Sequence, residues 1–333
     1  VEMMASGMDF GAYNSVATVE DAEDLRRALG VARWNLYGIS YGTRVGLEYL
    51  RRHPQPVRSA ILDSVFPPNS PHGADQMGVT AQAYHALQRA CDAQPACAAR
   101  HPDLLGALSK ATQKLDAAPL PREGGRIDGG ALAAALWAML VSSESAPWVP
   151  LAIEQAARGD EVVIRRIVEV FGGSGGFGDF SHGQAMAVNC HEATTGNTTD
   201  TRREMIARYP QLASAGERPE ETDRLCAAWQ TTHAPMSQYA PVASEVPVLL
   251  YAGEFDPATP FDDALLAARH LPNSTLAFVR GASHAAFYQD DCTRGIASGF
   301  LDQPQARQSL ECLSARPATV FPVAGLEDFL KAP

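Results

Sequence analysis

The stretch that most constrains the fold of this chain is "WNLYGISYGTRVGLEYL" at residues 34–50. Its opening letters, "WNLYG", form an apolar run that predicts a short buried strand, and the letters from the second glycine onward have helical spacing up to Arg52. Between strand and helix lies "GISYG", which matches the pattern G-x-S-x-G and encloses Ser40 between two glycines. The chain is therefore expected to make a sharp strand-to-helix turn at Ser40.

The two glycines of this turn, Gly38 and Gly42, are expected where the backbone is crowded. Side chains at both positions should clash with the neighbouring strand and helix. The turn presents Ser40 at the N-terminus of the helix, where the helix dipole and the Tyr41 N–H can stabilise negative charge on a bound acyl oxygen. We predict Ser40 as a nucleophile and Tyr41 as an oxyanion donor. The alternative is an ordinary serine in a structural turn.

A serine nucleophile requires a base to take its proton and an acid to orient that base. In a parallel sheet, both partners are expected in loops at the carboxyl ends of later strands. Asp256 follows the strand in "VPVLLYAGEFDPATP", and His284 follows the strand in "FVRGASHAAF". The order Ser, Asp, His is that of the α/β-hydrolase fold. We predict a catalytic triad of Ser40, Asp256 and His284.

Other side chains compete for these roles. Asp63 also ends a strand, but that strand directly follows the strand of Ser40, so we predict a structural loop residue there. Glu254 lies two residues before Asp256 and is expected to point away from the site. Among the nine histidines, His284 is the one that follows a late strand.

The alternation of predicted strands and helices indicates an α/β protein with a parallel sheet. Strands are predicted at 34–38, 57–65, 246–253 and 275–280. Between the second and third predicted strands the sequence pattern is helical, with helices predicted at 78–91, 103–116, 130–141 and 150–171. We therefore predict an α/β-hydrolase core formed by 1–66 and 245–333, incomplete at its N-terminal side, with a helical cap inserted at 67–244.

Charge and hydropathy exclude two classes of partner. The formal net charge is −11, and no stripe of clustered lysine and arginine is found, so nucleic acid is not expected to bind. No apolar run is long enough to predict a membrane span.

Six cysteines fall into three neighbouring pairs along the chain: Cys91 with Cys97, Cys190 with Cys226, and Cys292 with Cys312. An even count with local pairing predicts disulfides and an oxidising compartment, so we expect a secreted or periplasmic protein. The alternative is six reduced, buried thiols.

Three stretches together carry a family resemblance: "WNLYGISYGTRVGLEYLRRHPQPVRSAILDSVFPP", "VPVLLYAGEFDPATP" and "GASH". They resemble the tripeptidyl and prolyl aminopeptidases among the α/β-hydrolases, in their secreted bacterial branch. The resemblance implies a serine exopeptidase that releases short peptides or single residues from free N-termini, with no metal or organic cofactor. It also implies that the cap closes over the substrate's N-terminus and that cap carboxylates hold the α-ammonium group. Glu192, in "NCHEA", is the candidate for that role.

The resemblance is incomplete before Ser40. Hydrolases of this fold usually run through several strands before the nucleophile, and a loop there donates the second oxyanion N–H. The first 39 residues contain no such strand or loop. We expect either a separate polypeptide that completes the sheet or a chain whose start was removed. Two further alternatives stay open: a carboxylesterase or amidase acting on small acyl substrates, and a non-catalytic binding protein of the same fold.

Overall fold

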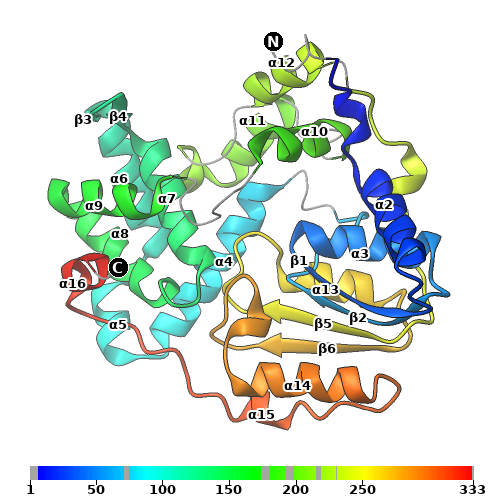
Figure 1. The fold of residues 1–333 in the computed structure, drawn as a ribbon. Coiled ribbons are helices and arrows are strands. Elements are labelled where there is room, and N and C mark those ends of the chain that lie inside the picture. Colours follow the sequence, from blue (N-terminus) through cyan, green and yellow to red (C-terminus); the bar gives the residue numbers. More distant parts are fainter. Residues whose placement is uncertain are drawn as a thin grey trace.

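A four-stranded parallel sheet forms the centre of the computed structural model, which describes residues 7–70, 75–173, 181–192, 199–214, 219–229 and 231–331. The strand order is β1-β2-β5-β6, and each neighbouring pair is parallel. The strands are β1 (Trp34–Ile39), β2 (Val57–Asp63), β5 (Val248–Gly253) and β6 (Ser274–Val279). All four carboxyl ends therefore lie at one edge of the sheet, towards the helical half of the molecule (Figure 1).

Helices cover both faces of this sheet, as Figure 1 shows. The helices α2 (Ser15–Ala28), α3 (Tyr41–Arg52) and α13 (Phe261–Ala268) pack on one face, where Leu62 and Leu250 are buried. The helix α14 (Asp291–Asp302) packs on the other face against Ile61 and Leu249. Neighbouring residues of one strand thus enter opposite cores, as the two-residue period of a strand requires.

The strand that ends at Ser40 lies at the margin of the described sheet. The sheet residues of β2 and β5 are almost all buried, whereas exposed and half-buried residues alternate along β1, and Tyr37 is 45% exposed. The N–H groups of Trp34 and Ser40 donate towards β2. Within the described ranges, no strand pairs with the other side of β1.

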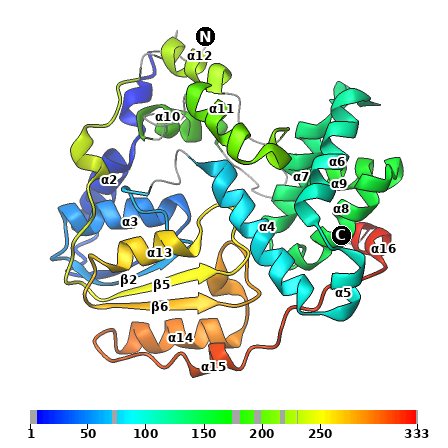
Figure 2. The ribbon, with the colours of Figure 1, turned by 180° about the vertical axis from the view of Figure 1, so that it is seen from behind.

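The segment between β2 and β5 forms a helical half with its own hydrophobic core, in which Leu87, Leu136 and Ile153 are fully buried. Its helices are α4 (Gln76–Asp92), α5 (Pro95–Arg100), α6 (Leu104–Ala117), α7 (Gly129–Val141), α8 (Val149–Arg158), α9 (Glu161–Phe171), α10 (His182–Glu192), α11 (Thr199–Arg208) and α12 (Pro219–Trp229). Seen from behind in Figure 2, α4 to α9 stand beside the carboxyl edge of the sheet, whereas α10 and α12 lie above α2 and α3. None of the helices in the described ranges is long and apolar enough to cross a membrane.

The structure differs from the sequence prediction at two places in this half and at the C-terminal helix. The helix expected over 150–171 is two helices, because Gly159 adopts a left-handed conformation (φ 85°) and Asp160 caps the next helix. A short hairpin, β3 (Leu120–Arg122) and β4 (Gly125–Ile127), lies between α6 and α7, where no strand was predicted. The last helix, α16 (Leu326–Lys331), packs against α9 of the helical half, although 245–333 was predicted to belong to the core.

The three predicted disulfides are present. Each joins two neighbouring helices: α4 to α5, α10 to α12, and α14 to α15 (Glu311–Ser314). The remaining short elements are 3-10 helices: η1 (Phe10–Ala12), η3 (Ala146–Trp148), η5 (Pro210–Leu212), η6 (Met236–Tyr239) and η7 (Ala286–Tyr288).

Candidate active site

Ser40 occupies the sharp turn that the sequence predicts between β1 and α3. Its backbone has φ 55° and ψ −124°, a conformation that is strained for any residue with a side chain. The Ser40 N–H donates to the Asp63 carbonyl oxygen at 3.0 Å, and its own carbonyl oxygen accepts from the Thr43 N–H at 2.9 Å. These bonds tie the turn to β2 and to the first turn of α3, so the strain is maintained by its surroundings.

The two glycines of the turn have different roles. A Cβ atom on Gly38 would lie 2.4 Å from the carbonyl oxygen of Gly42, which no side chain can tolerate. A Cβ atom on Gly42 would meet nothing within 4 Å. The expectation that both positions exclude a side chain is therefore right for Gly38 and wrong for Gly42, because the close approach is between the end of the strand and the backbone of the helix.

This difference predicts opposite results for two matched variants. Gly38→Ala should lower the free energy of unfolding by about 1–3 kcal/mol or more, because the backbone of Gly42 cannot move away without opening the turn. Gly42→Ala should be neutral or stabilising by up to about 1 kcal/mol, since alanine favours a helix. Thermal unfolding of both proteins measures the difference. Equal stability of the two variants would contradict this view of the turn.

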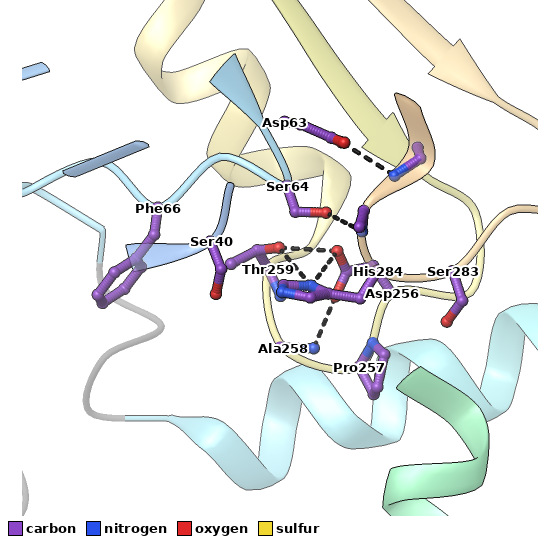
Figure 3. A network of polar contacts seen from close by, with 12 residues as sticks. Ser40, Asp63, Ser64, Phe66, Asp256, Pro257, Ala258, Thr259, Ser283 and His284 are labelled. Atoms are coloured by element: carbon purple, nitrogen blue, oxygen red, sulfur yellow. Dashed lines mark hydrogen bonds and ion pairs between the residues drawn. The ribbon is translucent and has the colours of Figure 1, made fainter. Parts of the chain in front are cut away.

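The structure brings Asp256 and His284 together at the carboxyl ends of β5 and β6. The His284 Nδ1 atom lies 2.9 Å from Oδ2 and 3.0 Å from Oδ1 of Asp256 (Figure 3). The same carboxylate accepts the N–H groups of Ala258 and Thr259, each at 2.9 Å, and the Thr259 hydroxyl at 2.7 Å. Asp256 is also buried. Its hydrogen bonds to the loop hold the carboxylate in place while it faces the imidazole.

The charges of this pair support each other. Burial alone raises the pKa of Asp256, but the nearby His284 charge and the hydrogen bonds to the carboxylate outweigh burial and lower that pKa below its ordinary value. Burial alone lowers the pKa of His284, but the charge of Asp256 and the hydrogen bond to it raise that pKa above its ordinary value. An imidazole that gains a proton is thus stabilised at this position.

Ser40 and His284 lie in one polar network, without a direct bond. The Ser40 N–H bonds to Asp63, and the next residue, Ser64, accepts the Ala285 N–H with its hydroxyl oxygen at 2.9 Å. Figure 3 shows Ser40 in the close-up that contains His284. Within the described part of the chain, the Ser40 hydroxyl makes no hydrogen bond to the imidazole or to any other group. Such contacts are commonly long in a site without substrate.

Tyr41 is the first residue of α3, and its N–H has no acceptor among the described residues. The phenol oxygen of Tyr41 lies 2.9 Å from the hydroxyl oxygen of Ser15, so the side chain points away from the backbone N–H. Burial, with the nearby negative charge of Glu192, raises the pKa of the Tyr41 phenol to about 12. The backbone N–H is therefore free to bind an oxyanion, while the phenol stays protonated.

Glu192, at the end of α10, is buried and bonded to protein groups. One carboxylate oxygen accepts the Ser15 N–H at 2.5 Å, and the other accepts the Ser15 hydroxyl at 2.8 Å and lies 3.0 Å from Arg44 Nε. The disulfide between Cys190 and Cys226 ties this end of α10 to α12. The carboxylate therefore faces a cation, as expected, but in this structure that cation belongs to the protein.

Asp63, at the end of β2, has a structural role, as predicted, but sequence reasoning missed which loop it binds and missed its neighbour Ser64. The buried Asp63 carboxylate accepts the N–H groups of Ala286 and Phe287, each at 2.9 Å, and Ser64 accepts the N–H of Ala285. Burial raises the pKa of Asp63 to about 6. Both residues thus hold the loop that follows His284. Their position at a strand end was visible in the sequence, but their partners were not.

The fold defines a protein of the α/β-hydrolase class. A family model described as alpha/beta hydrolase fold matches residues 6–94, and one described as TAP-like protein matches residues 213–312. The chain belongs to the α/β-hydrolases, in their TAP-like group.

Individual relatives match over short segments. Serine protease Hip1 of Mycobacterium tuberculosis (strain ATCC 25618 / H37Rv) is 40% identical over 65 residues, which are 19% of this chain and 12% of that protein. Proline iminopeptidase of Xylella fastidiosa (strain 9a5c) is 40% identical over 48 residues, 14% of this chain and 15% of that protein. The crystal structure of proline iminopeptidase from Mycobacterium smegmatis is 16% identical, with a TM-score of 0.37, covering 90% of this chain and 74% of that one.

Proposed function

We propose that this chain is a serine peptidase that cleaves short peptides from free N-termini, with Ser40 as nucleophile, His284 as base and Asp256 as the acid that orients it. The observation that carries the proposal is the pair of His284 and the buried Asp256, 2.9 Å apart, at the sheet edge where Ser40 is held at φ 55°. The peptidase names of the relatives favour a peptide substrate.

The proposed reaction follows the usual two steps of a serine hydrolase. Ser40 Oγ attacks the carbonyl carbon while its proton passes to His284 Nε2, and the resulting oxyanion accepts the Tyr41 N–H. His284 then gives this proton to the leaving amine as the peptide bond breaks, which leaves an acyl-enzyme on Ser40. Water, deprotonated by His284, hydrolyses the ester and restores the serine. Asp256 keeps the Nδ1 proton in place and stabilises the imidazolium in both steps.

We further propose that Glu192 attracts the α-ammonium group of the peptide. Support comes from its burial and from its contact with Ser15, which also bonds to Tyr41 beside the nucleophile. Arg44 already lies 3.0 Å from this carboxylate, so the ammonium group has to share Glu192 with Arg44 or displace it. That ion pair is also the observation that favours the second candidate, a carboxylesterase or amidase with no need for a free N-terminus.

Two further proposals concern the setting of the site. The side of β1 with no partner strand among the described residues is the expected position for an additional strand from a separate polypeptide, which would supply the second oxyanion N–H. Three disulfides support an extracellular or envelope location.

One set of measurements on the purified protein tests the proposed function. A fluorophosphonate probe should label Ser40, and the intact mass of the same sample shows whether a second polypeptide accompanies the chain.

Substrate specificity is the second measurement. Free tripeptide and prolyl amides should be cleaved, whereas the N-acetylated substrates should not. Glu192→Gln should remove this preference and retain cleavage of small esters, with Glu254→Gln as the control carboxylate. Cleavage of blocked and free substrates at equal rates would favour the esterase; absence of any adduct would indicate a binding protein.

A further inference from the structure

The helix α7 of the insert ends directly against the loop that carries His284. The Val141 carbonyl oxygen accepts the His284 N–H at 3.1 Å. The Ser143 hydroxyl oxygen, just beyond the helix, accepts the Ser283 N–H at 2.7 Å. The Ser283 hydroxyl donates to the Leu140 carbonyl oxygen, in the last turn of the helix. Two consecutive residues of the loop are thus hydrogen-bonded to one helix end.

The same helix also contacts the loop of Asp256. The Trp137 indole N–H donates to the Pro257 carbonyl oxygen at 3.3 Å, one turn before the helix ends. The fully buried Ser283 hydroxyl also lies 3.2 Å from the carbonyl oxygen of Phe255, the residue before Asp256. The helix α7 therefore binds both loops whose side chains form the Asp256–His284 pair.

The core holds the other side of the same loop. Asp63 and Ser64 accept the N–H groups of the three residues after His284, whereas α7 and Ser143 bind His284 itself and the residue before it. In Figure 3, Asp63 and Ser64 lie above the imidazole, Pro257 lies below it and Ser283 lies to its right. The loop thus has one anchor in the core and one in the insert.

These contacts satisfy groups that would otherwise have no partner. The last carbonyl groups of a helix accept no hydrogen bond from N–H groups of the same helix, so they need donors from outside it. Here the donors come from the His284 loop, and Ser283, with no exposed surface, has no water to replace them. Displacing α7 would therefore leave buried donors and acceptors unpaired on both sides, which ties the position of the insert to the position of the imidazole.

We propose that α7 of the insert positions the catalytic base, with Ser143 and Ser283 as positioning residues, so that movement of the insert changes the competence of His284 directly. This inference rests on the proposed function, because it assigns His284 as the base. The insert would then position the catalytic base in addition to covering the substrate. An event in the insert, such as substrate filling it, is then coupled to proton transfer at Ser40.

The variant Ser143→Ala tests this proposal, with the adjacent Ser142→Ala as matched control. Ser142 is exposed, and among the described residues its hydroxyl oxygen accepts only the Glu144 N–H, outside the loop. On a small activated ester, Ser143→Ala should lower kcat about tenfold with KM unchanged, as expected for the loss of one hydrogen bond to a positioning group. Ser142→Ala should behave as the parent protein, and Ser143→Thr, which keeps the hydroxyl, should restore kcat.

A spectroscopic readout keeps this test independent of turnover. In protein labelled with 15N-histidine, the His284 Nδ1 proton shared with Asp256 is assigned by comparison with His284→Gln. Its exchange with water should be at least about fivefold faster in Ser143→Ala than in Ser142→Ala, because the loop is less fixed. Equal exchange and equal kcat in the two variants, at similar thermal midpoints, would overturn the proposal. An inactive parent protein would overturn the proposed function, while the exchange comparison would still decide whether α7 fixes the imidazole.

Discussion

Replacing Ser40 with alanine is expected to lower kcat about 10⁵–10⁶-fold, because alanine cannot form the acyl-enzyme of the proposed mechanism. The fold should not change: the hydroxyl of Ser40 makes no hydrogen bond to another described residue, and the turn is held by backbone bonds to Asp63 and Thr43. Hydrolysis of ester and peptide substrates, with fluorophosphonate labelling, measures the loss, and the thermal midpoint checks the fold.

A second serine controls for the effect of removing a hydroxyl group. Ser109 lies on α6 in the insert and accepts a hydrogen bond from Gln113 at 2.9 Å, away from the strand ends. Ser109→Ala should retain labelling and turnover. If Ser40→Ala retained turnover as well, the nucleophile would have to be another residue and the proposed mechanism would be wrong.

Replacing Asp256 with asparagine is expected to lower kcat about 10³–10⁴-fold while the site stays folded. Asparagine fills the same space, but its amide can present N–H groups to His284 Nδ1. The imidazole then carries its proton on the nitrogen that should accept from Ser40. Single-turnover and steady-state rates on one ester substrate measure this loss.

The pH dependence of Asp256→Asn gives an independent check. The proposed base, His284, can accept a proton only when neutral, so the rate should rise with pH as its proton leaves. The charge of Asp256 and the hydrogen bond to it raise the pKa of His284, against the opposing effect of burial. Their removal lowers that pKa, and the rise in residual activity should move to lower pH. An unchanged midpoint would indicate that Asp256 does not face the imidazole in solution.

Asp63 is the matched control for this experiment, since it is a second buried carboxylate near His284. Its oxygens accept backbone N–H groups of the loop rather than the imidazole, so Asp63→Asn should cost less activity than Asp256→Asn. The reverse order of the two losses would exchange the roles assigned to these residues.

Much of the fold is visible in the sequence because it is encoded locally. Apolar runs, helical spacing and glycine positions indicate the four strands and the turn at Ser40, and neighbouring cysteines indicate the three disulfides. The break at Gly159 was missed although its signal, glycine followed by a capping aspartate, is also local. The hairpin β3–β4 has only three residues in each strand, too few for a periodic pattern.

The sequence by itself determined which residues could do chemistry: a serine on a strained turn, and an acid and a histidine after later strands. Only the tertiary structure decided what each of them touches. It places Asp63 on the backbone of the loop after His284, pairs Glu192 with Arg44, and sets the end of α7 against the histidine loop. The physical reason is that turns and strands follow from neighbouring residues, whereas hydrogen-bond partners at a sheet edge depend on how distant segments pack.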